Sequence, residues 1–362
     1  MMILKTMILR LVPAIAATAA ALVAPSAYAL TIGLVAPQGG PYDLLGQQMR
    51  VGAEAAAKAS GDTILVVDEP CAAGSGPAIA DKLTAARVDA AIGFLCSESL
   101  DGALPKLADA GIPALTLSVR WPTVMEDALK QQWPLYRLAP SNKAENEQVV
   151  QAIVSQWAGA AFALLDDGTI RSRELVEAIR EPLEARGMKP VFTDTYRPGQ
   201  EQQIALVRRL KKTGATNVFI GGDRSDVAII ARDAKAENIP LTVMGGEAMK
   251  AVDRPVPLQD GVLAVITPDY AGFPSAQMAV EALRQQGSDA DGYTLPAYAA
   301  VQFLDTAATL DQPTLDKAVA VAKVNTVIGP IAFTSGHELT VNPFQLQEWR
   351  DGAFRLPRPL SE

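Results

Sequence analysis

Few residues in this sequence could do redox, nucleophilic or metal chemistry. The chain has two cysteines, Cys71 and Cys96, and one histidine, His337. A catalytic cysteine would need His337 as its base, and transition-metal sites draw mainly on cysteine and histidine. Within the chain the two cysteines can bond only to each other, so they form either a disulfide or two free buried thiols. We therefore expect no catalytic residue and no metal site.

Motifs for cofactor chemistry are incomplete. Asp166-Asp167-Gly168 is not followed by the spacing of an EF-hand calcium loop. Gly39-Gly40 lacks the context of the dinucleotide fingerprint, and no P-loop lysine motif is present. We expect no cofactor and no enzyme. One alternative stays open, because a carboxylate pair such as Asp223 and Glu247 could act as acid and base in a secreted hydrolase.

The composition is that of an acidic folded protein. Among 362 residues there are 32 Lys+Arg and 40 Asp+Glu, which gives a formal net charge of −8. Nucleic-acid binding needs clustered Lys and Arg, and the sequence contains no such block, so we expect no nucleic-acid partner. The length predicts two domains or one large domain.

The first residues are typical of an export signal. Lys5 and Arg10 precede an apolar run from Leu11 to Ala24, and Ala27-Tyr28-Ala29 forms an A-x-A cleavage signature. We expect cleavage after Ala29 and a periplasmic mature chain; an uncleaved membrane anchor is the alternative. An oxidising compartment favours a disulfide between the two cysteines.

Strand-like and helix-like segments alternate along the chain. The expected strands are Thr31–Ala36, Thr63–Val67, Asp89–Leu95, Ile112–Leu117, Leu135–Ala139, Ala161–Leu165, Val191–Tyr196, Asn217–Gly221, Leu241–Gly245, Gly261–Thr267, Val327–Phe333 and Phe344–Trp349. The expected helices are Leu44–Lys58, Pro77–Arg87, Leu100–Ala110, Ala144–Trp157, Arg173–Arg186, Glu201–Thr213, Asp226–Asn238, Ser275–Gln286 and Pro296–Asp311. This alternation predicts an α/β fold of two Rossmann-like lobes with parallel sheets, which bind ligands at the carboxyl ends of their strands.

Several motifs, in their order along the chain, resemble those of one family. They are Thr31-Ile32-Gly33-Leu34-Val35-Ala36-Pro37, Gly39-Gly40-Pro41-Tyr42, Asp68-Glu69-Pro70-Cys71, Gly93-Phe94-Leu95-Cys96-Ser97, Ala110-Gly111-Ile112-Pro113, Met244-Gly245-Gly246-Glu247 and Ile328-Gly329-Pro330. The chain resembles type I periplasmic binding proteins, in particular the leucine/isoleucine/valine-binding branch that serves ABC importers. The resemblance covers essentially the whole mature chain.

The resemblance implies two lobes with a ligand cleft and a three-segment hinge. The lobes would be residues 30–139 plus 268–330 and residues 140–267 plus 331–362, after a signal peptide at 1–29. It also implies a monomer that captures a small polar ligand (an amino acid, an amide or a small carboxylate) by hinge closure and delivers it to a membrane permease. The alternative is a periplasmic sensor that presents its closed form to a membrane receptor.

The resemblance also implies a ligand site. Ser97 matches a serine that holds the ligand carboxylate, although it could instead be a loop or capping serine. Ser118 matches a residue whose backbone carbonyl accepts a hydrogen bond from the ligand ammonium. Glu247 matches the acidic residue that pairs with that ammonium.

Four positions depart from the family pattern. Arg120 stands where relatives have a small hydroxyl residue, and a guanidinium repels an ammonium and suits a carboxylate. It either binds ligand, or is held by Glu247, or lies outside the cleft. Leu45 and Ile170 match tyrosines of the branched-chain binders, and Asp223 matches a position that is often aromatic. The pocket thus has fewer aromatic walls and more charge, which argues against Leu, Ile or Val as the ligand.

Overall fold

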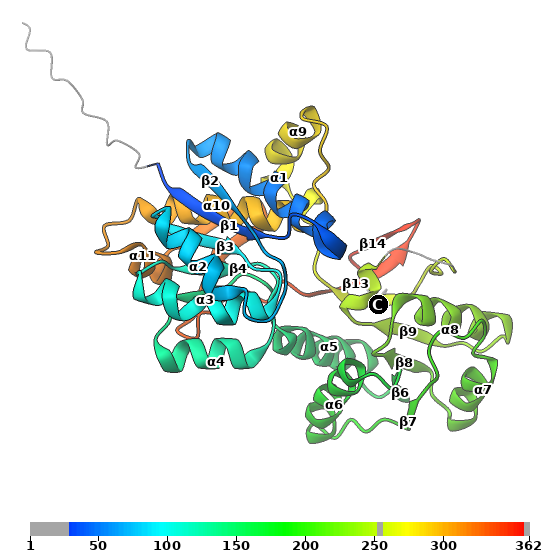
Figure 1. The fold of residues 1–362 in the computed structure, drawn as a ribbon. Coiled ribbons are helices and arrows are strands. Elements are labelled where there is room, and N and C mark those ends of the chain that lie inside the picture. Colours follow the sequence, from blue (N-terminus) through cyan, green and yellow to red (C-terminus); the bar gives the residue numbers. More distant parts are fainter. Residues whose placement is uncertain (1–28, 252–255, 358–362) are drawn as a thin grey trace, which may run out of the picture.

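A computed structural model describes residues 29–251 and 256–357. The expected signal peptide lies outside the described residues, except for Ala29. The described residues form two lobes, each built on its own sheet (Figure 1), so the predicted α/β fold is confirmed. In this part of the chain no helix combines the length and the apolar character that crossing a bilayer requires.

The amino-terminal lobe contains a parallel sheet in the order β2-β1-β3-β4-β5. Its strands are β1 (Thr31–Ala36), β2 (Thr63–Asp68), β3 (Ala90–Gly93), β4 (Ala114–Thr116) and β5 (Leu135–Arg137). One face packs against α2 (Gly76–Ala85), α3 (Ser97–Asp109) and α4 (Pro122–Gln131). The other packs against α1 (Asp43–Ser60), α9 (Gln277–Gln285), α10 (Thr294–Ala308) and α11 (Leu315–Val321).

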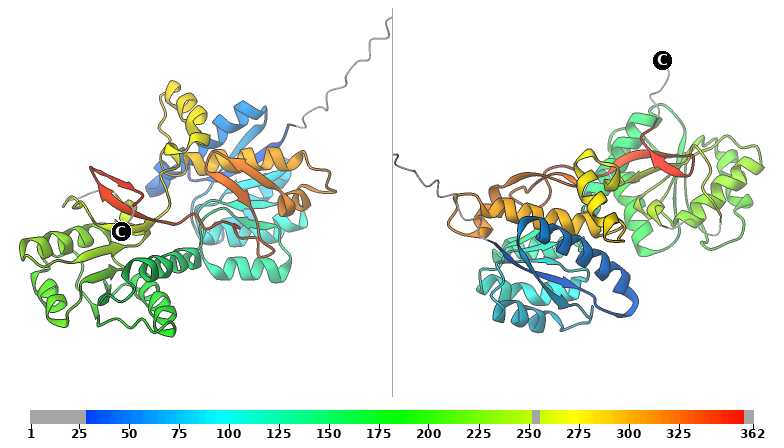
Figure 2. Two further views of the ribbon diagram at one scale, coloured as in Figure 1. Left: turned by 180° about the vertical axis from the view of Figure 1, so that it is seen from behind. Right: turned by 90° about the horizontal axis from the view of Figure 1, so that it is seen from above.

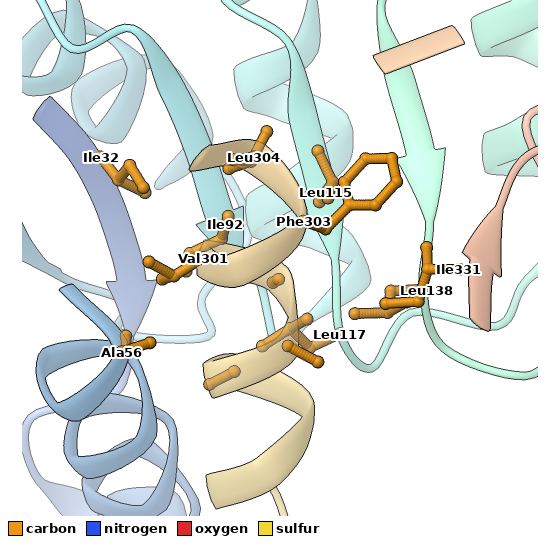
Figure 3. Packing of buried hydrophobic residues seen from close by; sticks show 14 of the residues in the cluster. Ile32, Ala56, Ile92, Leu115, Leu117, Leu138, Val301, Phe303, Leu304 and Ile331 are labelled. Atoms are coloured by element: carbon orange, nitrogen blue, oxygen red, sulfur yellow. The ribbon is translucent and has the colours of Figure 1, made fainter. Parts of the chain in front are cut away.

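The core of this lobe explains why its strands are continuous apolar runs. Figure 3 shows Ile32 and Ile92 of the sheet facing Val301 of α10. The opposite face of the same strands is also buried, under α2, α3 and α4. Strands covered on both faces need apolar residues at successive positions rather than an alternating pattern.

The carboxyl-terminal lobe contains a mixed sheet in the order β14-β13-β10-β9-β8-β6-β7. Its parallel strands are β6 (Phe162–Asp166), β7 (Phe192–Thr195), β8 (Asn217–Ile220), β9 (Thr242–Gly245) and β10 (Leu263–Ile266). Strands β13 (Gln345–Arg350) and β14 (Ala353–Arg355) are antiparallel. Helices α5 (Asn142–Trp157) and α6 (Ile170–Ala185) cover one face, and α7 (Ile204–Thr213) and α8 (Arg224–Ala236) cover the other.

The last third of the chain completes both lobes, as expected. Figure 2 shows α9, α10 and α11 beside the amino-terminal strands, while β13 and β14 lie on the carboxyl-terminal lobe. The strand expected over 327–333 is shorter than predicted. It is β12 (Gly329–Ala332), which forms an antiparallel hairpin with β11 (Lys323–Thr326). Helices α4 and α11 and strands β11 and β14 were not predicted.

The chain passes between the lobes in three places, after β5, after β10 and before β13. The expected lobe boundaries at 139 and 268 remain predictions that agree with the first two passages. Ile331 and Phe333 pack in the core of the amino-terminal lobe. We therefore propose moving the third boundary from 330 to about 340.

A close helix contact fixes the start of α10. A Cβ atom on Gly52 of α1 would lie 1.8 Å from the backbone oxygen of Thr294, the first residue of α10. Only glycine permits this approach. The contact holds Tyr293, the residue before α10, at a defined place at the edge of the amino-terminal lobe.

The predicted disulfide is confirmed. Cys71, in the loop after β2, bonds to Cys96, the residue that caps α3, with a Cα–Cα distance of 5.4 Å. The bond closes a loop with a sequence separation of 25. A cross-link over a loop of this length stabilises a fold by about 3.5 kcal/mol in the chain-entropy model.

We predict that thiol titration of the unfolded, unreduced protein finds no free thiol. Reduction should lower the melting temperature, because the unfolded chain regains the entropy of the open loop. Calorimetric scans with and without reductant test this. An unchanged melting temperature in protein shown to carry two free thiols would contradict it.

Candidate functional site

A cavity of about 500 Å³ lies between the two lobes, beside the first two passages of the chain. The amino-terminal lobe contributes Leu117 and Arg120 from the loop after β4, and Tyr293 with Leu295 at the start of α10. The carboxyl-terminal lobe contributes Glu247 and Lys250. The connecting segments contribute Leu138, Ala139, Pro140, Thr267, Pro268, Asp269 and Tyr270.

Arg120 and Glu247 form an ion pair across this cavity. The Nη1 and Nη2 atoms of Arg120 donate to the two carboxylate oxygens of Glu247, the second at 3.1 Å. The side chains are 24% and 17% exposed, so the pair is largely shielded from water. Desolvation acts to lower the pKa of Arg120, but the hydrogen bonds and charge of Glu247 outweigh it and raise the pKa overall. Of the predicted alternatives for Arg120, the structure shows the one in which Glu247 holds it.

A buried carboxylate fixes the position of Glu247. Glu145 of α5 is 2% exposed, and its Oε1 accepts a hydrogen bond of 2.8 Å from the backbone N–H of Glu247. Its Oε2 lies 3.4 Å from Arg171. Burial raises the pKa of Glu145, an effect that the hydrogen bond from Glu247 and the charge of Arg171 oppose. Glu145 thus orients the backbone that presents Glu247 to the cavity.

Lys250 brings a second cation to the cavity. It lies three residues after Glu247 in a 3₁₀ turn, Glu247–Lys250, where residues at this spacing share a side. Its Nζ donates to Thr267 Oγ1 at 2.8 Å, and no carboxylate of the described residues lies within ion-pair distance of it. Desolvation lowers the pKa of Lys250, against the opposing charges of Glu247 and Asp269.

Two tyrosines also line the cavity. The hydroxyl of Tyr293, which lines the cavity, donates to Ser118 Oγ at 2.8 Å, so the predicted Ser118 contacts a lining residue but does not itself line the cavity. Tyr270 lines the same cavity, and burial followed by the charge of Glu247 raises its pKa to about 12. The Tyr270 phenol therefore stays protonated at neutral pH and can donate a hydrogen bond.

Ser97 lies outside this cavity. It is the first residue of α3 and lines a separate hollow of about 200 Å³ with Glu98 and Trp121. Its side chain does not cap the helix, because the N-cap position is Cys96. Its role toward a ligand stays a prediction.

Glu69 holds the loop that leads to Ser97. It is 1% exposed, and its carboxylate accepts hydrogen bonds from the backbone N–H groups of Leu95 and Cys96, at 2.8 and 3.0 Å. Burial is the main cause that raises the pKa of Glu69 to about 7, although these hydrogen bonds lower it. Glu69, Cys71 and Cys96 lie close enough to hold a metal ion, but the cysteine sulfurs are joined in the disulfide and cannot act as thiolate ligands.

The other predicted site residues do not line the 500 Å³ cavity. Leu45 is partly buried in α1, Asp223 is an exposed residue before α8, and Ile170 is 76% exposed at the start of α6. Glu247 lines this cavity and Asp223 does not, so the structure does not bring the two carboxylates into one site. Ligand contacts by Leu45, Ile170 and Asp223 stay predictions.

Arg120 also lines a larger neighbouring cavity of about 600 Å³, formed by α4, the start of α5 and residues 334–343. None of the other predicted site residues lines it. We take the smaller cavity as the candidate site because both charges of the interlobe pair face it.

The sequence analysis missed Tyr293, Lys250 and Glu145. Lys250 follows Glu247 by three residues, and this spacing could have predicted that both side chains lie on the same side of a helical turn. No local pattern marks Tyr293 or Glu145, because their contacts join segments far apart in the sequence.

Comparisons with known proteins agree on one family. Residues 29–353 match the family model described as periplasmic binding protein. The chain is 24% identical to "Leu/Ile/Val-binding protein homolog 3" of Brucella melitensis biotype 1, over 95% of this chain and 98% of that protein. Among solved structures it is similar to a branched-chain amino acid transporter substrate-binding protein of Streptococcus pneumoniae in complex with isoleucine (16% identity, TM-score 0.65, 90% and 97% covered). It is also similar to a solute-binding protein of an ABC transporter from R. palustris in complex with benzoate (19% identity, TM-score 0.64, 90% and 95% covered).

We predict that Arg120→Ala and Glu247→Ala each lower the free energy of unfolding by about 1–3 kcal/mol, because each leaves a partly buried charge without its partner. The double variant should lose less than the sum. Urea unfolding of the three variants measures this. The exposed pair Arg284–Glu281 is the control, and its removal should have almost no effect. Strictly additive losses at Arg120 and Glu247 would contradict the coupling.

Glu69 should make stability depend on pH. Its native pKa of about 7 lies above the ordinary value of 4.5, so folding takes up a proton between these values. The contribution of Glu69 to the free energy of unfolding is therefore full below pH 4.5 and is lost as the pH rises through 7. Urea unfolding at several pH values measures the free energy of unfolding of wild type and of Glu69→Gln. Between pH 4.5 and 7 this free energy should fall for the wild type relative to the variant. A difference that does not change with pH would rule the assignment out.

Proposed function

The chain belongs to the periplasmic binding protein family, and from that premise we propose that it captures a small carboxylate-bearing solute between its lobes and delivers it to the membrane permease of an ABC importer. The family consists of binding proteins, so the expectation that the chain is not an enzyme is confirmed. The ligand, the permease and the closing motion are parts of the proposal.

The observation that carries the proposal is the ion pair that spans the cavity. Arg120 belongs to one lobe and Glu247 to the other, and both face a cavity of a size that suits a small organic molecule. A ligand that interacts with either charge would contact both lobes. It would therefore stabilise the closed arrangement over an open one, which is how hinge closure is coupled to binding.

The relatives support a carboxylate as the common chemical feature. The curated relative is named for leucine, isoleucine and valine, and the two solved relatives hold isoleucine and benzoate. All of these compounds carry a carboxylate, while only the amino acids carry an ammonium. Arg120, which occupies both oxygens of the acid that could pair with a ligand ammonium as the resemblance implies, weighs against Leu, Ile and Val for this chain.

The same proposal includes the cellular setting. We propose that residues 1–29 direct export, that cleavage follows Ala29, and that the mature protein works as a monomer in the periplasm. The disulfide between Cys71 and Cys96 supports an oxidising compartment.

A thermal-shift screen of amino acids, amides and small organic acids tests the function. A ligand present at 100 times its Kd should raise the free energy of unfolding by about 2.7 kcal/mol, and hence the melting temperature. Glu247→Gln should increase the shift that an acid causes, because it frees the Arg120 guanidinium, whereas Glu281→Gln, on an exposed helix face, should leave the shift unchanged. If no compound of a broad set moves the melting temperature, the proposal fails.

A further inference from the structure

The cavity contains one cation that is already neutralised and one that is not. The Arg120 guanidinium donates two hydrogen bonds to Glu247, whereas the Lys250 ammonium donates to the neutral hydroxyl of Thr267. We infer that Lys250 is the anchor for the ligand's carboxylate, and that the site selects small carboxylic acids that lack an α-ammonium group. This inference rests on the proposed function and names the class of its solute.

The first step concerns the acid that would hold an ammonium. Both oxygens of Glu247 accept from Arg120, and its backbone is fixed by Glu145. A ligand ammonium could use Glu247 only after displacing the Arg120 guanidinium. An amino acid would bring its own carboxylate and ammonium, so Arg120, Lys250 and the ligand ammonium would compete for Glu247 and the ligand carboxylate. One of these three cations would then lack an anionic partner in a site that is partly shielded from water, which is costly.

The second step concerns the anion. Lys250 is exposed as a residue, but its ammonium group reaches into the cavity far enough for desolvation to lower its pKa. A carboxylate beside it would give the Lys250 ammonium an anionic partner without breaking an existing ion pair. The hydroxyl groups of Thr267 and Tyr270 line the same cavity and can donate further hydrogen bonds.

Two acidic residues also line the cavity, Asp269 and Asp291, and both are exposed to water. The Oδ1 of Asp269 accepts a hydrogen bond of 3.1 Å from the backbone N–H of Ala271. Water screens both charges, so they weaken the attraction for an anion less than a buried carboxylate would.

The third step concerns the body of the ligand. The remaining walls are apolar side chains and tyrosine rings, namely Leu117, Leu138, Leu295, Ile328, Tyr270 and Tyr293. Such walls favour an apolar or aromatic group over a second charged one. The combined chemistry is that of a small monocarboxylate with a hydrocarbon or aromatic body.

Two pairs of probes isolate the ammonium group. 4-Methylpentanoate differs from L-leucine, and 3-phenylpropanoate from L-phenylalanine, only by that group. The amides of both acids remove the negative charge instead. Calorimetry on protein freed of bound solute by unfolding and refolding should show at least one acid binding tenfold or more tightly than its amino acid and its amide.

Variants of Lys250 then test the anchor. Lys250→Met should weaken acid binding at least tenfold and leave any amide binding unchanged, while Lys250→Arg should retain most of the affinity. Lys82→Met, an exposed change of the same charge on α2, is the control and should bind like wild type. Tighter binding of the amino acids, or wild-type affinity for acids in Lys250→Met, would overturn the inference while leaving the proposed function intact. Absence of binding by every acid, amide and amino acid would instead overturn the proposed function.

Discussion

The ion pair between Arg120 and Glu247 is the constraint on which the character of the site depends. It joins the loop after β4 to the turn after β9, and so connects two lobes that otherwise have separate sheets and separate cores. Charges this well shielded need partners. Any solute that enters must therefore leave both charges compensated, and this requirement links the chemistry of the ligand to the arrangement of the lobes.

Much of the fold could be predicted because buried parallel strands and their helices leave strong patterns. Strands such as β1 and β6 are apolar at almost every position, since helices cover both of their faces. Helix α4 was not predicted, because it buries only Val124, Met125 and Ala128 and its apolar pattern is therefore weak. The third boundary, at 330, stays a prediction. Ile331 and Phe333 are apolar residues that suit the core of either lobe by sequence, and their contacts in the amino-terminal core favour a later boundary.

The site could be predicted in part. The order of the motifs indicated the positions of Arg120 and Glu247, and their opposite charges suggested that they could pair. Sequence could not reveal that Tyr293 holds Ser118, because the two residues are 175 positions apart and meet only through the packing of α10. Glu69 belonged to a recognised motif, but its burial beneath the loop before Ser97 is a property of the folded lobe alone.

The pair is better understood as a source of selectivity than of stability. Removing two ions from water costs about as much as their attraction returns, so a buried pair adds little to the net free energy of folding. The ion pair instead determines which chemical group of a ligand can approach Glu247. A small hydroxyl residue at position 120, as in the branched-chain binders, would leave this acid open to an ammonium. With Arg120 present, both oxygens of the acid already accept hydrogen bonds within the protein, and the cation of the cavity that has only a neutral hydrogen-bond partner among the described residues is Lys250. A single substitution in a ligand loop thus changes which charged group of the cavity is open to a solute.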